Sequence, residues 1–355
     1  MLKIRYITII LILAALMSSC EKVVDFNPGE VEPYVVMVSK PVGDSLVAVY
    51  LGYSRFFLDN REFNLIDNAT VTITSGNNTA VGTYDPQCFI LGEYDDGDYY
   101  YYYDTTYYGG YRFVLRPNPG DTMRINATVP GRDEAVSAMT VVPRQPQIEI
   151  VDFVVDTLDE GYSQEFYYRL RFKINCNSNK EYFSVRLLQA QTNLVDSVLV
   201  WDTTQMASQY FSVNDPIVNN ASLEDAFDGD DGSFYGRVMN FSSERFTGGS
   251  HEFTMEFSMT RYATYDWYYV QPDPLTRSFI IDIRALSEEL YRYNVTSTGY
   301  TSDLDDLFAE PVQVYCNIKG GIGIFGASTI KKVKMPTPRV ENFHNSSSYY
   351  YKKKK

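Results

Sequence analysis

The chain is poor in the residues that most often carry out catalysis. It contains two histidines, and His344 lies in a polar C-terminal segment, so His251 is the remaining candidate for a histidine general base. No G-x-S-x-G or H-E-x-x-H motif accompanies it. We therefore expect that the protein is not an enzyme and has no catalytic residues. A glycan hydrolase that uses only two carboxylates stays an alternative, because the chain has 45 acidic residues.

Cysteine is scarce as well, with four in 355 residues. Cys88, Cys176 and Cys316 lie far apart and form no C-x-x-C pair, which argues against a zinc site. At most one disulfide can form among these three, and the sequence does not decide which. Cys316 lies in a run with strand-like alternation, so we expect a buried free thiol there.

Basic residues are outnumbered by acidic ones. The formal net charge is −14, and it becomes −16 if residues 1–19 are removed, because that segment holds two basic residues and no acids. Such a charge repels phosphate backbones, so we expect no nucleic-acid partner. Acidic clusters at 95–98 and 228–231 lack the spacing of a calcium-binding EF-hand loop. We expect neither a bound metal nor another cofactor.

No apolar run is long enough to span a membrane as a helix. The N-terminal run, which follows Lys3 and Arg5 and ends at Met17, is far shorter than the roughly 20 residues required. It predicts a signal peptide over residues 1–19. The ending Met-Ser-Ser-Cys resembles the lipobox of bacterial lipoproteins, which implies cleavage before Cys20 and acylation of its side chain. Acyl chains at Cys20 would then anchor the protein in a lipid bilayer through a tether of residues 20–30.

Alternation of apolar and polar residues predicts an all-β protein with two domains. In residues 68–84, for example, Val71 and Ile73 share one face and threonines share the other, and a Ser-Gly-Asn-Asn turn follows. Pro143 and Pro146 mark a boundary. We expect an N-terminal sandwich of immunoglobulin or transthyretin type over 31–145. A larger antiparallel β domain over 146–338, with one or two short helices, would follow it.

Three further features of the second half are predicted. The clearest helix covers residues 287–294, where a serine could cap the N-terminus. In the strand 168–174, Arg169, Arg171 and Lys173 alternate with apolar residues and form a cationic outer face. The last segment, 339–355, is polar and of low complexity, which predicts a disordered tail.

The densest cluster of one residue type is a run of tyrosines. Nine of the 18 residues from 94 to 111 are tyrosine. Tyrosine combines a flat apolar ring with a hydroxyl group, which suits contacts with proteins and sugars. The candidate residues for binding a ligand or partner are Tyr99, Tyr101, Tyr103, Tyr107 and Tyr108. Gly109-Gly110 is expected to form a turn, and packing of these tyrosines against the adjoining domain is the alternative.

A literal G-x-G-x-x-G occurs at Gly321, Gly323 and Gly326. The motif indicates a dinucleotide site only when it follows a strand and opens a helix. Here β-branched residues and a proline follow, and alternating residues at 311–318 and 322–325 flank Lys-Gly-Gly. This pattern predicts a β-hairpin with positive φ at the glycines.

The segment 278–326 contains FIIDIRALSEELYRY and LFAEPVQVYCNIKGGIGIFGA. In these runs and in their order it resembles the C-terminal signature of domain-of-unknown-function family 4249, which comprises lipoproteins of the Bacteroidota. CEKVVDFNP, NATVTI and PGDTMRINATVPG match the family nearer the N-terminus. The resemblance implies a lipoprotein of the outer membrane, commonly encoded beside a TonB-dependent, SusC-like receptor.

From this resemblance we expect a non-catalytic binding or accessory subunit of such a transporter. The first alternative is a structural or assembly component of the cell envelope. Acids directly after the cysteine often accompany surface display in this phylum, whereas here Glu21 and Lys22 are followed by two valines. Display on the surface and attachment on the periplasmic side therefore both stay open.

Overall fold

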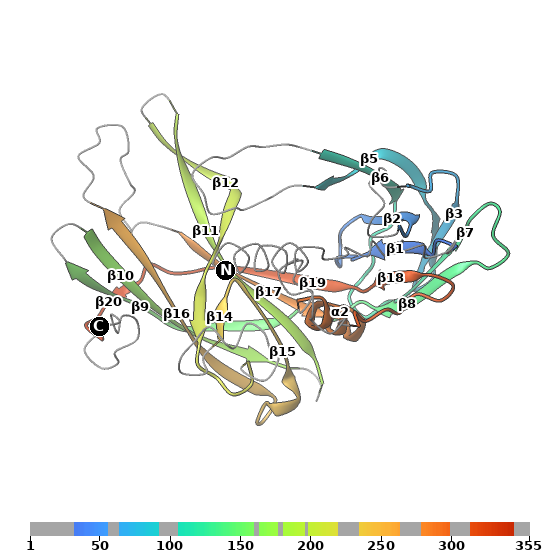
Figure 1. Cartoon of the computed structure of the whole chain (residues 1–355). Helices are drawn as coiled ribbons and strands as arrows, with labels where there is room; N and C mark the ends of the chain where they lie inside the picture. Colours follow the sequence, from blue (N-terminus) through green and yellow to red (C-terminus); the bar gives the residue numbers. More distant parts are fainter. Residues whose placement is uncertain are drawn as a thin grey trace, which may run out of the picture. The chain divides into compact units, whose positions relative to one another are not determined.

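Four β-sheets carry most of the regular structure in the computed structural model of the chain (Figure 1). The structure describes residues 32–55, 64–91, 106–159, 163–176, 180–195, 198–218, 234–262, 278–298 and 313–343. Within these ranges the strands are accompanied by one α-helix, α2 (Glu288–Thr298), and one 3-10 helix, η2 (Ser243–Arg245). The predicted all-β class is confirmed.

The first two sheets are formed mainly by the N-terminal half of the chain. In spatial order, the five-stranded sheet consists of β18 (Ile322–Phe325), β1 (Val35–Ser39), β2 (Val47–Tyr53), β6 (Thr106–Phe113) and β5 (Thr83–Leu91). The four-stranded sheet consists of β4 (Asn78–Val81), β3 (Thr70–Ser75), β7 (Thr122–Thr128) and β8 (Val136–Val141).

Alternation in the sequence decides which side chains these two sheets bury. In β3, Val71 and Ile73 are fully buried, and the threonines between them point to the other face. In β7, Met123 and Ile125 are buried in the same way. They form one cluster with side chains of the five-stranded sheet such as Met37. The two sheets therefore enclose a common core, as the predicted N-terminal sandwich requires.

The other two sheets are formed by the second half of the chain. The six-stranded sheet consists of β14 (Phe234–Gly236), β13 (Phe211–Val213), β16 (Ser250–Tyr262), β10 (Ser163–Asn175), β9 (Gln147–Asp159) and β20 (Arg339–Val340). The five-stranded sheet consists of β12 (Val198–Gln209), β11 (Tyr182–Val195), β17 (Phe279–Leu286) and β19 (Ser328–Lys334), and β15 (Val238–Ser242) also pairs with β11.

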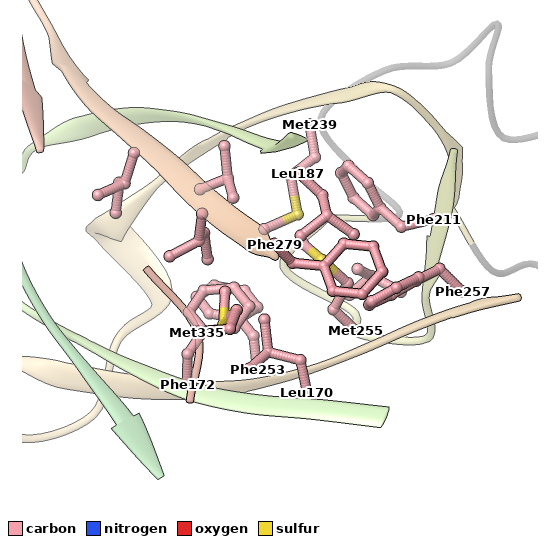
Figure 2. Close-up of a cluster of buried hydrophobic side chains, with 14 of the residues drawn as sticks. Leu170, Phe172, Leu187, Phe211, Met239, Phe253, Met255, Phe257, Phe279 and Met335 are labelled. Atoms are coloured by element: carbon pink, nitrogen blue, oxygen red, sulfur yellow. The ribbon is translucent and has the colours of Figure 1, made fainter. Parts of the chain in front are cut away.

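Aromatic rings fill the core between these two sheets (Figure 2). Tyr168 and Phe257 stack with ring centroids 4.8 Å apart, and Phe279 from the opposite sheet meets them edge-on at 5.1 and 5.0 Å. Phe172 and Phe253 stack at 5.4 Å. Each such pair contributes about 0.5–1.5 kcal/mol beyond the burial of its area.

The G-x-G-x-x-G segment forms strand β18, and the predicted hairpin is wrong. Residues 313–317 are not a strand, and β18 pairs in parallel with β1 instead. The segment after the motif is strand β19, so no helix follows it. Gly320 has φ +73°, as predicted for a turn, but Gly321 does not have the predicted positive φ. Gly323 has φ +122°, and a side chain there would collide with the carbonyl of Met37 on β1.

Asn317 takes the place of a partner strand on one side of β18. Its Oδ1 accepts a hydrogen bond from the N–H of Phe325 at 3.0 Å, and its Nδ2 donates to the carbonyl of Phe325 at 2.8 Å. This pair of bonds is what a neighbouring antiparallel residue would supply. One amide side chain thus satisfies both backbone groups of a fully buried residue.

The C-terminal part of the chain contributes residues to the first hydrophobic core and a strand to the second pair of sheets. Ile318, Phe325 and Ala327 belong to the first core, although the predicted boundaries place them in the second domain. The next strand, β19, then pairs with β17 of the second pair of sheets. All these elements belong to one compact unit, Tyr34–Lys355.

Two local predictions about the C-terminal half have different outcomes. The predicted helix is confirmed as α2, and the N–H of Leu290 donates to the capping hydroxyl of Ser287 at 3.3 Å. The predicted tail begins too early, because β20 pairs in parallel with β9. The N–H of Phe343 donates to Asp156 Oδ2 at 2.9 Å. Residues 339–343 therefore belong to the folded part of the chain.

Candidate functional site

The structure describes part of the tyrosine-rich segment that was predicted to bind. Four of the six predicted site residues lie outside the described residues: Cys20, Tyr99, Tyr101 and Tyr103. Tyr107 and Tyr108 lie on β6, where their backbones pair with Ile90 and Phe89 of β5. The described end of the tyrosine-rich segment is therefore part of a pair of antiparallel strands.

Gly109 and Gly110 do not form the predicted turn, because both lie inside strand β6. A side chain at position 109 would collide with the hydroxyl of Tyr84, and one at 110 would collide with the ring of Phe89. The two glycines thus leave room for aromatic rings that lie across the strand from β5. In the structure the two glycines allow close packing of aromatic rings, whereas the sequence alone predicted a turn at this position.

The tyrosines at this end of the sandwich divide between the two faces of the sheet. Tyr111 is 2% exposed, and its hydroxyl donates to the Ile66 carbonyl and accepts from the Ala69 N–H, both at 2.9 Å. Tyr84 packs edge-on against Tyr111 with ring centroids 5.6 Å apart. Tyr111 and Tyr84 therefore belong to the core, and Tyr108, an odd number of residues from Tyr111, lies on the outer face.

The outer face carries a cluster that we call the aromatic face: Tyr50 of β2, Phe89 of β5 and Tyr108 of β6. All three side chains are half-buried. The direct pairing of Phe89 with Tyr108 places both on one side of the sheet. Tyr50 lies between the buried Val49 and Leu51, so it points outward as well. Burial raises the pKa of the Tyr50 phenol, and the neighbouring Tyr108 raises it further.

The sequence pattern could have identified Tyr50, because strict alternation in β2 places it opposite the core side chains. No local signal identifies Phe89, since a β-bulge between Asp85 and Phe89 shifts the register just before it. Three aromatic rings on one sheet face offer flat apolar contact together with two hydroxyl groups. That arrangement suits a sugar ring or a protein surface.

A polar rim borders the aromatic face at the bulge of β5. Arg112 forms an ion pair with Asp85 and donates hydrogen bonds to the carbonyls of Gln87 and Cys88 at 3.0 and 3.3 Å. Burial raises the pKa of the Cys88 thiol, so the thiol is protonated and a poor nucleophile at neutral pH. The rim orders the backbone and supplies no reactive group.

His251, the histidine considered as a general base, is held by Asp215. The distance between His251 Nε2 and Asp215 Oδ2 is 2.7 Å, and Asp215 Oδ1 also accepts the N–H of Ile217 at 2.9 Å. The imidazole ring packs against Phe246 and Phe253 with centroids 5.3 and 4.6 Å away. These contacts attach the turn around 215–218 to β16.

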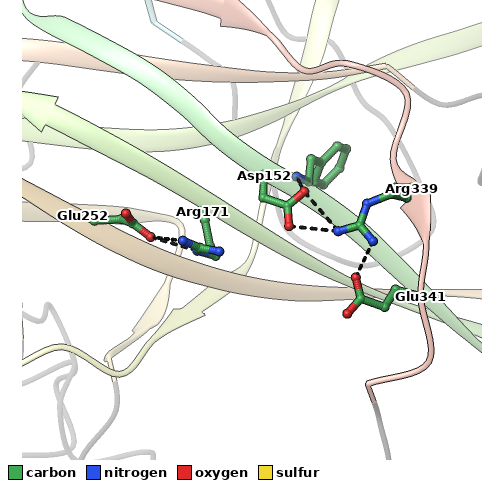
Figure 3. Close-up of polar contacts among 6 residues, drawn as sticks. Asp152, Arg171, Glu252, Arg339 and Glu341 are labelled. Atoms are coloured by element: carbon green, nitrogen blue, oxygen red, sulfur yellow. Dashed lines mark hydrogen bonds and ion pairs between the residues drawn. The ribbon is translucent and has the colours of Figure 1, made fainter.

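The basic residues 169, 171 and 173 lie on the outer face of β10, as predicted, but this face is not cationic, because neighbouring strands supply matching carboxylates (Figure 3). Arg169 pairs with Glu256 at 2.6 Å and Arg171 with Glu252 at 2.7 Å. Across β9, Arg339 of β20 lies 3.1 Å from Asp152. The face is a set of exposed ion pairs, and each pair contributes at most about 1 kcal/mol to stability.

The remaining chemical groups give no site of their own among the described residues. Cys88, Cys176 and Cys316 are free thiols, and Cys316 is exposed, so its predicted burial is wrong. The acidic residues 95–98 and 228–231 lie outside the described ranges. Across the described ranges, no three metal-ligating side chains gather, and no helix is both long and apolar enough to cross a membrane.

The chain matches the model of a known protein family over most of its length. The family model "Domain of unknown function (DUF4249)" matches residues 21–334. No curated protein matches the chain. A solved structure titled "Biofilm associated protein - B domain" is 5% identical to this chain and aligns over 84% of it and 86% of that structure. The TM-score of 0.15 is too low to support an inference from that structure.

Proposed function

The chain belongs to the DUF4249 family, whose function is unknown, and from that membership we propose a role in transport. The protein is a non-catalytic binding or accessory subunit of a TonB-dependent, SusC-like transporter. It is attached to the outer membrane through acylated Cys20. The lipobox-like sequence supports the anchor, and the family resemblance in the signature around 278–326 supports the transporter.

The aromatic face is the observation that carries this proposal. The opposite side of its sheet already faces the first core, so Tyr50, Phe89 and Tyr108 are not needed to fill that core. Half-buried aromatic side chains on an outer sheet face are typical of contact surfaces. The connection between β5 and β6, residues 92–105, lies outside the described residues, and its sequence contains six further tyrosines, among them the predicted binding residues Tyr99, Tyr101 and Tyr103.

A non-catalytic role agrees with how the candidate catalytic groups are used. His251 Nε2 and Asp215 are bonded to each other and to the surrounding backbone and rings. The carboxylates beside the arginines of β10 are likewise engaged in ion pairs. These groups hold strands and turns together, which is a structural use of charged side chains.

Purification from the native host tests the proposal. The full chain, carrying an affinity tag, is solubilised in mild detergent and purified, and the partners are quantified by mass spectrometry. We expect a TonB-dependent barrel in a stoichiometric amount. Truncating an aromatic side chain at the centre of an interface typically costs about 2 kcal/mol or more, or roughly thirtyfold in affinity. The double variant Tyr50→Ala, Tyr108→Ala should therefore recover far less barrel.

The matched control is Tyr34→Ala, which removes a tyrosine that is 58% exposed and lies outside the aromatic face. This variant should recover as much barrel as the unmodified protein. Equal recovery with the double variant would show that the aromatic face is not the contact. Recovery of the unmodified protein without any barrel would refute the transporter role.

A further inference from the structure

Strand register brings four basic side chains to the outer face of the sheet formed by β15, β11, β17 and β19. Arg186 of β11 pairs with Asp282 of β17, and Asp282 pairs with Lys332 of β19, so the three lie in one row. Arg284 and Lys334 lie one row away on either side, on the same face. We call Arg186, Arg284, Lys332 and Lys334 the cationic face.

A buried carboxylate organises the two arginines. Asp282 is 0% exposed, and its Oδ2 accepts from Arg186 Nη2 at 2.6 Å and from Arg284 Nη2 at 3.3 Å. Burial acts to raise the pKa of Asp282, but Arg284 and Arg186 outweigh it and leave the pKa lowered. The ionised carboxylate therefore holds both guanidinium groups in place while about a third of each arginine side chain is exposed.

One carboxylate does not balance these basic groups. On this face of the four strands the register places Asp282 as the single acid among the described residues. The contrast with β10 is direct, because Arg169 and Arg171 each have a glutamate of their own. Positive charge is therefore concentrated at one place on a chain whose net charge is −14.

Two buried polar atoms next to this cluster lack hydrogen-bond partners within the described part of the chain: Arg186 Nε and Asn240 Oδ1. Asn240 of β15 pairs with Ser184, two residues from Arg186 on β11. A buried polar atom without a partner is uncommon and often marks the place of a water, an ion or a ligand. Arg186 Nε is therefore a donor that the described protein groups do not use, whereas Asn240 Oδ1 is an acceptor and would need a water or a protonated ligand oxygen as its partner.

We propose that the cationic face binds a phosphate group. A guanidinium group recognises phosphate through paired N–H donors, and a lysine adds a point charge. Asp282 pre-orients both arginines, which reduces the entropy lost on binding. The phosphate belongs either to a soluble phosphorylated ligand or to a lipid headgroup. This inference does not depend on the proposed transport role.

Calorimetry on the full chain in neutral detergent micelles tests the site. One titration uses inorganic phosphate, and a second compares micelles that carry phosphatidylglycerol with micelles that carry phosphatidylcholine. The variant is Lys332→Gln, and the matched control is Lys331→Gln. Both lysines are exposed neighbours on β19 and lose the same charge, but Lys331 pairs with the core residue Ile283 and points to the opposite face.

We expect Lys332→Gln to weaken phosphate binding about tenfold and Lys331→Gln to leave it unchanged. Binding of inorganic phosphate with this pattern indicates a soluble ligand. The same pattern with phosphatidylglycerol alone indicates a lipid headgroup. Absence of binding in both titrations would overturn the proposal. Equal weakening by both variants would also overturn it, because it would show diffuse attraction without a site.

Discussion

Replacing Asn317 with alanine removes the side chain that pairs with the backbone of Phe325. The N–H and the carbonyl of that buried residue would then lose partners at 3.0 and 2.8 Å. Each unpaired buried backbone group costs about 1–3 kcal/mol. Asn317 is half-buried, so water can reach part of the space it leaves. We expect the free energy of unfolding to fall by about 3 kcal/mol, in the lower half of the summed range.

The aspartate variant tests the same bonds without removing the shape of the side chain. Asn317→Asp keeps an acceptor for the Phe325 N–H but replaces the donor with a charged oxygen that faces the Phe325 carbonyl. At neutral pH it should therefore be no more stable than the alanine variant. The matched control is Asn126→Ala, which removes an exposed asparagine on β7 of the same sandwich and should change stability by less than about 0.5 kcal/mol.

Two measurements decide the outcome. The urea midpoint followed by circular dichroism reports global stability, and hydrogen exchange of a peptide covering 322–327 reports β18 itself. We expect a lower midpoint and faster exchange for both Asn317 variants. If Asn317→Ala matches Asn126→Ala in both measurements, water replaces the amide at no net cost and the reasoning is wrong.

Four other perturbations have definite expected outcomes. Gly323→Ala should lower the free energy of unfolding, measured by urea denaturation, by more than about 2 kcal/mol. Its φ is +122°, and an alanine side chain would collide with the backbone of β1. Iodoacetamide should label the exposed Cys316 before Cys176. Burial raises the pKa of Cys176 to about 11, so only about a thousandth of its thiol is ionised at pH 8. Equal labelling rates of the two cysteines, measured by mass spectrometry, would contradict this prediction. The Asp282→Asn variant should be less stable than the unmodified protein at neutral pH. This difference in stability should vanish as the pH falls through the lowered pKa of Asp282, because the carboxyl group of the unmodified protein is then also uncharged. A difference in melting temperature that does not depend on pH would show that the ion pairs of Asp282 do not stabilise the fold. Truncation after Pro338 removes β20 and exposes the unpaired backbone groups of β9 at the edge of the sheet. Light scattering should then show self-association of the truncated protein. A truncated protein that stays monomeric with unchanged stability would contradict this prediction.

The local periodicity of apolar and polar residues was sufficient to predict where the strands and the helix lie. The alternation around Val71 and Ile73 identified β3 and its buried face, and the helical stretch 287–294 with its serine cap identified α2. These patterns work because the side chains of a strand or helix repeat with the geometry of their own backbone. The same reasoning failed at Gly109-Gly110, because the rings that lie against those glycines come from a different strand.

The sequence by itself determined the all-β class, the alternating core faces, the capped helix and the scarcity of catalytic side chains. Only the tertiary structure decided the partners of each strand: β18 beside β1, β20 beside β9, and Arg186 beside Asp282. It also decided that Phe89 joins Tyr50 and Tyr108 on one face. Alternation reports which side of a strand is buried, but hydrogen bonds between strands are much the same for every residue. The choice of neighbour and register therefore depends on how side chains distant in the sequence pack together.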